Sequence, residues 1–331
     1  DSTGDANTNK IVIGRGGSKI KGLCTDADLK TDRVGVRLIY SDASQGWVTT
    51  TSANETAPVL DTTKYVTATG GTETTSGDYK IHTFNSDANF VVSCAGTATG
   101  SNKVSYLVVA AGGGGGSGYG GGGGAGGFRE GKCSSDPYTD SPLDSGVSLS
   151  VPAATYPITV GAGGTGGSPP SPAPSSGGSG NNSIFSTITS AGGGGGGKND
   201  GTAGLAGGSG GGGGAACAVG GAGNTPPVRP PQGNNGGTAS AGHPVGYYGG
   251  GGGGTGAVGN PGNPPTNGTG GAGLATSINA SSVTRGGGGG GSHYPSPSRP
   301  TSGAAGGSGG GGAGGSVGPN PFTQAGSGTA N

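Results

Sequence analysis

The chain has 331 residues, of which 89 are Gly and 22 are Pro, and its 16 basic and 16 acidic residues give a formal net charge of zero. Neutrality is not typical of disordered chains, which combine low hydrophobicity with high net charge. Lys and Arg do not cluster as they do in proteins that bind nucleic acids or anionic membranes, and the apolar runs are far shorter than the roughly 20 residues of a membrane-spanning helix. We therefore expect no nucleic-acid partner and no membrane insertion.

Short β-strands are predicted before Tyr106. The segments concerned are rich in Val, Ile, Thr and aromatic residues and are separated by Gly, Asp, Asn and Ser, which is typical of strands and turns. No segment has the apolar period of a long amphipathic helix, and only residues 26–29 could form a short helical turn. We therefore predict a fold that is mainly β and non-helical, with a β-sandwich-like N-terminal part. The predicted strands are residues 10–13, 34–40, 47–51, 79–84, 89–94 and 104–110.

The composition changes near Tyr106, because only 12 of the 89 glycines lie in residues 1–105. Three parts are therefore predicted: a small β-rich module over 1–60, with an assembly arm at 1–9, β-sandwich-like strands over 61–111, and a glycine-rich domain over 112–331. In the last part, β-like pieces near residues 147–160, 184–189 and 274–283 could return to the sandwich. Glycine runs occupy residues 112–116, 120–124, 192–197, 210–214, 249–254, 286–291 and 309–312, with segments rich in Pro, Ser and Asn between them.

The glycine runs need an unusual source of stability, because glycine has no side chain to bury and loses the most backbone freedom on folding. A polyglycine II helix has three residues per turn, a rise of about 3.1 Å per residue and no internal hydrogen bonds. Its N–H and C=O groups can therefore bond to neighbouring helices, and buried backbone groups must be paired. We predict a bundle of polyglycine II helices with Pro-rich connecting loops.

The four cysteines, Cys24, Cys94, Cys133 and Cys217, have no CxxC spacing, so a zinc site is not expected. An even number of cysteines in an exported chain permits two disulfides. We expect Cys24 to pair with Cys94 and Cys133 to pair with Cys217. Free buried thiols are the alternative.

Two stretches near the composition boundary resemble a known family. HTFNSDANFVVSCAG and KVSYLVVAAGGGGGSGYGGGGGAGGF look like the start of the glycine-rich domain found in many bacteriophage tail-fibre and adhesin proteins. A similar arrangement occurs in the extracellular glycine-rich region of one receptor tyrosine kinase family. YPITVGAGGTGG and NSIFSTITSAGGGGGG fit the same pattern, so the resemblance covers about residues 80–331.

The opening of the chain is similar to another group. NKIVIGRGGSKIKG and LIYSDASQGWVTT resemble short β modules at the start of phage structural proteins from marine and environmental sources. Together the resemblances imply a sandwich-like β domain that carries packed polyglycine II helices, with loops at an exposed end that contact a receptor. They also imply an extracellular or virion-surface location.

Enzyme motifs are weak in this sequence. Gly113, Gly115 and Gly118 follow a predicted strand as in GxGxxG, but a dinucleotide site needs a helix next, and glycine is the poorest helix former after proline. Two near matches to the phosphate-binding P-loop have Asn199 and Cys133 where Ser or Thr should meet magnesium. The three histidines lie far apart, without a nucleophile motif. We therefore predict no enzymatic activity, no catalytic residues, no cofactor and no metal.

Aromatic and basic residues in the predicted loops are the candidates for receptor contact, because loops on a rigid scaffold carry recognition and Tyr offers a large contact area at low entropic cost. The alternative is that these rings only pack over the ends of the polyglycine helices. The candidates are Arg229, His243, Tyr247, Tyr248, His293, Tyr294 and Arg299.

The leading hypothesis is a non-enzymatic structural protein, an adhesin or fibre component similar to phage tail fibres, which presents loops on a rigid glycine-rich scaffold. Its partners would be copies of itself, as a trimer, and a glycan or protein receptor on a host surface. The alternative is a secreted subunit of a self-assembling extracellular filament, in which residues 1–9 or an edge strand pair with the next copy. An enzyme that acts on carbohydrates or nucleotides is a remote third reading.

Overall fold

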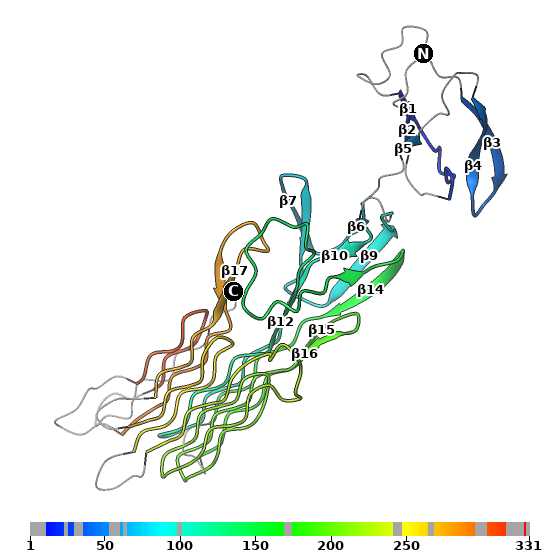
Figure 1. Ribbon diagram of the computed structural model, residues 1–331. Helices are drawn as coiled ribbons and strands as arrows, with labels where there is room; N and C mark the ends of the chain where they lie inside the picture. The colour runs from blue at the N-terminus through cyan, green and yellow to red at the C-terminus, as the bar shows by residue number, and fades with distance from the viewer. Residues whose placement is uncertain are drawn as a thin grey trace. The chain divides into compact units, whose positions relative to one another are not determined.

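A computed structural model describes residues 11–22, 26–29, 36–52, 60–61, 65–97, 101–168, 174–240, 247–263, 268–294, 303–315 and 328 (Figure 1). These residues form β-strands and irregular segments, and none of them is helical, which confirms the predicted class, mainly β and non-helical. Among them, no helix exists that is long and apolar enough to cross a membrane. The predicted arm at residues 1–9 lies outside the described residues.

The chain forms two compact units, and each draws on separate parts of the sequence. The first contains residues 1–70, 90–104 and 150–155, and the second contains residues 71–89, 105–149 and 156–331. Segments from the predicted sandwich region, residues 61–111, thus contribute to both units.

The first unit contains small antiparallel sheets. β2 (Ala27–Leu29) pairs with β1 (Ile11–Ile13) and with β5 (Leu60–Asp61), while β3 (Val36–Asp42) and β4 (Gly46–Ser52) form a hairpin. The helical turn that the sequence left possible at residues 26–29 is not formed, because this backbone bonds to strands on both sides. Further strands of the chain in this region are β6 (Thr67–Thr69), β9 (Ala88–Cys94) and β10 (Lys103–Val104), of which β6 and β9 pair.

The second unit contains several hairpins from which the glycine-rich segments extend. β11 (Tyr106–Val109) pairs with β12 (Phe128–Gly131), and Phe128 and Glu130 on β12 are almost completely buried. The strands predicted near 147–160, 184–189 and 274–283 are found, the last two as hairpins rather than single strands. Its other strands are β7 (Thr72–Ser76), β8 (Tyr79–Thr83), β15 (Ser183–Phe185), β16 (Ile188–Ser190), β17 (Leu274–Thr276) and β18 (Val283–Arg285), while β13 (Leu149–Ser150) and β14 (Ala154–Thr159) have residues in both units.

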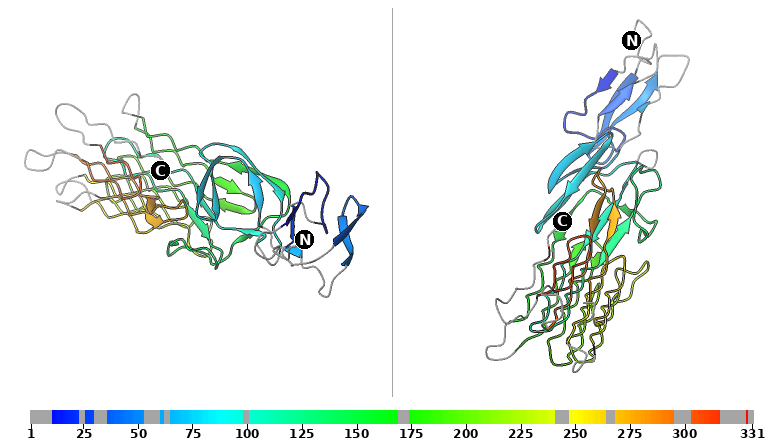
Figure 2. Two further views of the ribbon diagram at one scale, coloured as in Figure 1. Left: turned by 90° about the horizontal axis from the view of Figure 1, so that it is seen from above. Right: turned by 90° about the vertical axis from the view of Figure 1, so that its left-hand side faces the viewer.

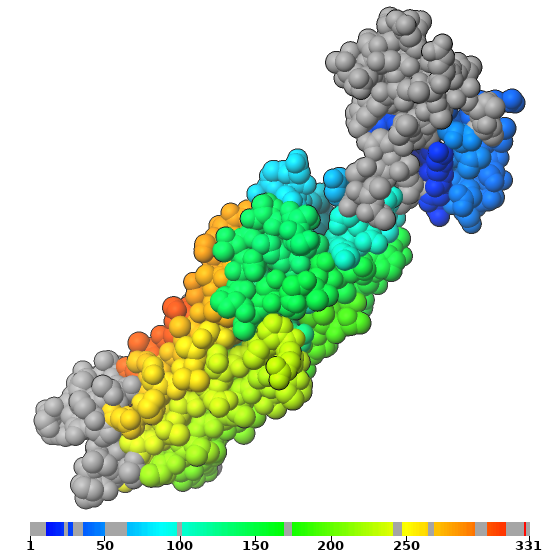
Figure 3. All heavy atoms as spheres, viewed as in Figure 1, coloured from blue at the N-terminus to red at the C-terminus, as the bar shows by residue number. Residues whose placement is uncertain are grey.

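Glycine-rich segments with neither strand nor helix structure, which we call tracts, fill the rest of the second unit. They run side by side in both views of Figure 2, and on the face shown in Figure 3 their atoms pack closely against one another. We call the end where tracts join β11, β12 and β16 the strand end, and the opposite end, where the chain reverses at residues 117–119, 199–201 and 215–217, the far end. The tracts comprise residues 111–116, 120–127, 161–168, 174–182, 191–198, 202–206, 209–214, 218–222, 231–240, 247–254, 258–263, 268–273, 286–292, 303–307 and 311–315.

Backbone hydrogen bonds join each tract to several others with a repeat of three residues. In the central tract, residues 120–127, the N–H groups of Gly121, Gly124 and Gly127 donate to tract 191–198, at N···O distances of 2.7–2.9 Å. Those of Gly122 and Ala125 donate to tract 247–254. A β-strand would instead repeat every two residues.

Three residues per turn is the repeat of a polyglycine II helix, so the bonding pattern is the one that such helices require. The helical conformation of the individual tracts stays a prediction. One expected run is different: Gly309 and Gly310 belong to a turn with φ of +96°, and the tract begins only at Gly311.

Packing around the central tract excludes side chains on several sides. A Cβ atom added to Gly121 would lie 2.0 Å from the carbonyl oxygen of Gly212, and one on Gly123 would lie 2.0 Å from that of Gly113. Contacts this short are overlaps with backbone atoms that cannot rotate away. Glycine is therefore required at these positions, because neighbouring tracts approach them closely.

We predict that Gly212→Ala destabilises the protein, because its new Cβ would lie 2.0 Å from the carbonyl oxygen of Gly250. Overpacking of this kind typically costs about 1–3 kcal/mol. Gly166→Ala is the matched control, since an added Cβ there meets nothing within 4 Å. Thermal unfolding should show a lower Tm for the first variant alone, and equal Tm values would contradict the packing described here.

Candidate functional site

Five aromatic residues gather at the far end of the bundle. Tyr119 lies in the reversal between the first two tracts, Tyr247 and Tyr248 begin tract 247–254, and His293 and Tyr294 follow tract 286–292. Backbone hydrogen bonds hold these residues together. The N–H of Ser292 donates to the carbonyl oxygen of Gly120 (2.9 Å), and the N–H of Tyr294 donates to the carbonyl oxygen of Tyr247 (3.0 Å).

The inner layer of this cluster is a buried pair of rings. Tyr248 is 1% exposed and His293 is fully buried, and their rings stack with centroids 5.8 Å apart. Ser240 fixes this pair to a further tract, because its hydroxyl accepts a hydrogen bond from the N–H of Tyr248 (2.9 Å). The two rings therefore close the end of the bundle.

The outer layer consists of Tyr119 and two further tyrosines that contact its ring. The ring of Tyr119 stacks on Tyr247 at 5.6 Å and meets the edge of Tyr294 at 5.2 Å, and Tyr294 is 50% exposed. Burial raises the pKa of Tyr119, and Tyr294 and Tyr247 raise it further. Tyr119 therefore stays uncharged at neutral pH.

A group of rings with hydroxyl tips suits recognition, because each ring offers apolar area and its hydroxyl can donate or accept a hydrogen bond. Edge-to-face and stacked neighbours also restrict the rings before any partner arrives, which lowers the entropic cost of binding. We call the three outer residues, Tyr119, Tyr247 and Tyr294, the tyrosine cluster.

The structure brings together four of the candidates predicted from the sequence: Tyr247, Tyr248, His293 and Tyr294. Tyr119 was missed, although it stands in SGYG between two glycine runs, which is the signal of a reversal. Tyr248 and His293 are buried, so their side chains are not exposed for contact with a partner.

Arg229 does not join the tyrosine cluster. It lies in a loop at the strand end, since nearby Gln232 accepts a backbone hydrogen bond from Phe128 at the start of β12. Tract 231–240 then separates it from Ser240, beside Tyr248. The remaining candidates, His243 and Arg299, lie outside the described residues.

The predicted disulfide between Cys133 and Cys217 is wrong, because both are free thiols. Cys133 follows β12 at the strand end, whereas Cys217 lies in the reversal at residues 215–217 at the far end. A tract of eight residues with the predicted rise spans roughly 25 Å, and a disulfide needs Cα atoms within about 7 Å. Cys94 is disulfide-bonded, and its predicted partner Cys24 lies outside the described residues.

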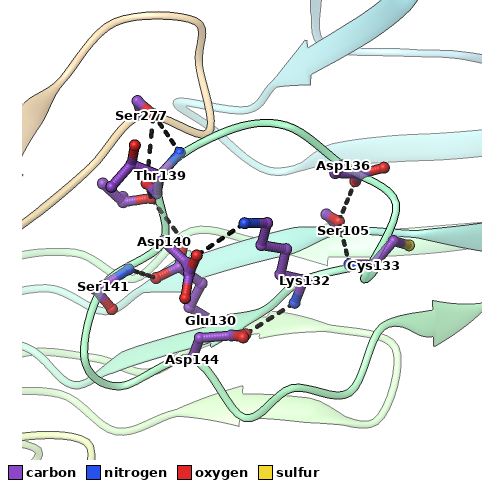
Figure 4. A network of polar contacts seen from close by, with 11 residues as sticks. Ser105, Glu130, Lys132, Cys133, Asp136, Thr139, Asp140, Ser141, Asp144 and Ser277 are labelled. Carbon is purple, nitrogen blue, oxygen red and sulfur yellow. Dashed lines mark hydrogen bonds and ion pairs between the residues drawn. The ribbon is translucent and has the colours of Figure 1, made fainter.

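A second group of polar residues lies at the strand end, around the buried carboxylate of Glu130 (Figure 4). Its two oxygens accept hydrogen bonds from the N–H of Ser141 (2.9 Å) and the hydroxyl of Thr276 (2.7 Å). Glu130 is 1% exposed. The carboxylate thus joins the loop after β12 to β17, and this network was not predicted from the sequence.

Other contacts hold the same loop in place. Lys132 forms an ion pair with Asp140 (2.8 Å), which raises the pKa of Lys132 and lowers that of Asp140, and its Nζ lies 5.0 Å from the ring centre of Tyr138. The backbone N–H of Lys132 also donates to Asp144 (2.9 Å). Because these groups are engaged with one another, we assign them to holding the loop.

We predict that Glu130→Ala destabilises the protein by about 2–5 kcal/mol, because the N–H of Ser141 and the hydroxyl of Thr276 would lose their buried acceptor. Asp140→Asn, which weakens a more exposed ion pair in the same loop, should have a smaller effect. Urea unfolding of both variants measures the difference. Equal losses would show that Glu130 is not the anchor of this loop.

Comparison with known proteins adds one finding. A family model described as a glycine-rich domain matches residues 93–330. No curated protein and no solved structure matches the chain. The match covers well over half of the sequence, so the chain belongs to this glycine-rich domain family.

Proposed function

We propose that this member of the glycine-rich domain family is a non-enzymatic structural protein, an adhesin or fibre component like those of phage tails. Its glycine tracts serve as a rigid scaffold, and the tyrosine cluster at the far end contacts a receptor on a host surface. This role places the protein outside the cell or on a virion surface.

The observation that carries the proposal is the tyrosine cluster itself. Three rings from separated parts of the sequence meet at one end of a hydrogen-bonded bundle, and Tyr294 is half exposed. Tyrosine is enriched among the residues that dominate binding energies, and rigid placement reduces the cost of ordering them. The alternative function of these rings, to cover the tract ends, is already served by buried Tyr248 and His293.

The test uses labelled full-length protein and a panel of immobilised bacterial lipopolysaccharides and capsular polysaccharides, with whole cells as a second surface. Tyr294→Ala should weaken binding to any surface that retains the wild type by about tenfold or more, which corresponds to roughly 1.4 kcal/mol. Tyr65→Ala is the matched control, since Tyr65 is 66% exposed but precedes β6, in the first unit. Unchanged binding by Tyr294→Ala, or equal loss in both variants, would refute the role of the cluster.

The alternative function is a subunit of an extracellular filament. Outer tracts support it, because the N–H groups of Gly163 and Gly166 in tract 161–168 have no hydrogen-bond partner among the described residues and could pair with another chain. Electron micrographs of purified protein distinguish the two proposals. The adhesin proposal predicts discrete monomers or trimers, and indefinite filaments would favour the alternative.

A further inference from the structure

The central tract is bonded to five neighbours that surround most of it. Its N–H groups donate to tracts 191–198 and 247–254, and its C=O groups accept from tracts 111–116, 209–214 and 286–292. The tract repeats every three residues, and each of these three residues points its N–H in one direction and its C=O in another. Six directions around the tract are therefore available for bonds to neighbours. Five directions are occupied in this way.

The five neighbours follow one another around the central tract because they also bond among themselves. Tract 191–198 bonds to 111–116 on one side and to 209–214 on the other. Tract 247–254 likewise bonds to 209–214 and to 286–292. No hydrogen bond between described residues joins 111–116 to 286–292, so the sixth direction opens between these two tracts.

Unpaired backbone groups face this opening with the same three-residue repeat. Among the described residues, the N–H groups of Gly120, Gly123 and Gly126 have no hydrogen-bond partner. Their N–H groups point in the one direction around the central tract that no neighbouring tract occupies. They form a row of donors along the tract.

The flanking tracts supply acceptors in the same register. The C=O groups of Gly113 and Gly116 on one side, and of Gly287 and Gly290 on the other, receive no hydrogen bond from any residue that the structure describes. One row of donors thus lies between two rows of acceptors. A chain placed there could accept from the central tract and donate to both flanking tracts.

The space at this position is also open, which is a separate observation. A Cβ added to Gly112 or Gly115 would meet nothing nearer than 3.5 Å, and one on Gly289 nothing nearer than 3.1 Å. At Gly113, Gly114, Gly116 and Gly290 of the same flanking tracts, an added Cβ would instead lie 2.0–2.3 Å from backbone atoms. We call this place, between residues 111–116, 120–127 and 286–292, the open position.

We propose that the open position is a docking site for one glycine-rich segment of a second protein chain, which binds as an additional tract. Only a chain with an N–H and a C=O at each three-residue repeat matches the donors and acceptors, and only glycine fits where tracts approach closely. The row from Gly120 to Gly126 spans about 19 Å at 3.1 Å per residue, so a run of six to eight residues fills it.

A second chain is the proposed source because residues 1–331 contain no suitable glycine run outside the bundle. The long glycine runs of these residues already belong to the bundle, and residues 316–331 contain no two adjacent glycines and include Pro319 and Pro321, which lack an N–H. The open position begins beside the tyrosine cluster, since Gly120 follows Tyr119 directly, and it extends from there along the tracts.

The experiment measures fluorescence anisotropy of a labelled peptide of eight glycines with two lysines at each end, titrated with the full-length protein. We expect saturable binding. A peptide of the same charge, in which sarcosine replaces the glycines, lacks the N–H groups and should not bind. This comparison needs no protein variant, so it holds whether or not any variant folds.

The double variant Gly112→Ala, Gly115→Ala places two methyl groups into the open position without overlap with the bundle, and should weaken peptide binding at least about tenfold with an unchanged Tm. Gly163→Ala with Gly166→Ala is the control, since these positions lie on an outer tract with open space around them. The proposal is overturned by absence of saturable binding, by equal binding of the sarcosine peptide, or by equal effects of the two double variants. Binding that appears only after deletion of residues 316–331 would overturn it too, because the chain's own end would then be the occupant.

Discussion

The hydrogen bond between the backbones of neighbouring tracts is the interaction on which the second unit depends. In an ordinary domain, apolar side chains provide the stabilising burial, but here the interior consists of glycine, and backbone groups fill the role of packing surface. These bonds bring the backbones close together, and glycine is needed at most positions where tracts approach one another. The glycine-rich composition, the backbone hydrogen bonds and the close spacing of the tracts therefore depend on one another.

Large buried side chains are found at the two ends of the bundle. At the strand end, Phe128 and the buried carboxylate of Glu130 lie at the junction between strands and tracts, and at the far end Tyr248 and His293 cover the tract termini. Terminal backbone groups of a tract need partners just as those of a helix do, and side chains with large area or strong acceptors supply them. The residues that carry chemistry are thus confined to the two ends of the bundle, and the tyrosine cluster is an extension of one of them.

The sequence predicted the class of the fold because strands and glycine runs have strong local signals. β9 and β11 were recognisable from residues such as Phe90 and Val108, whereas β7 was missed because Thr72–Ser76 is wholly polar and exposed. β12 was missed because FREG is short and stands among glycines. Local pattern was enough wherever apolar side chains marked a buried face.

The arrangement of the tracts could not be predicted, because one glycine run has the same chemistry as another and carries no information about its neighbours. Arg229 illustrates the consequence, because its loop is as rich in Pro as a loop at the far end. The end of the bundle at which this loop lies is set by the number of chain reversals before it, including the one at residues 215–217. Tyr119 and Tyr294 meet for the same reason, across 175 positions of sequence, once their tracts become neighbours. The candidate residues for receptor contact could be identified from the sequence by their type, but their grouping needed the structure.

The back-and-forth course of the tracts between the two ends has a mechanical consequence. A tensile force applied between the strands at one end and the tyrosine cluster at the other acts parallel to the tracts. It therefore loads the backbone hydrogen bonds between the tracts in shear. Many such bonds would then have to break together before any tract could slide. A scaffold built this way resists tension along its axis, and it does so without a hydrophobic interior.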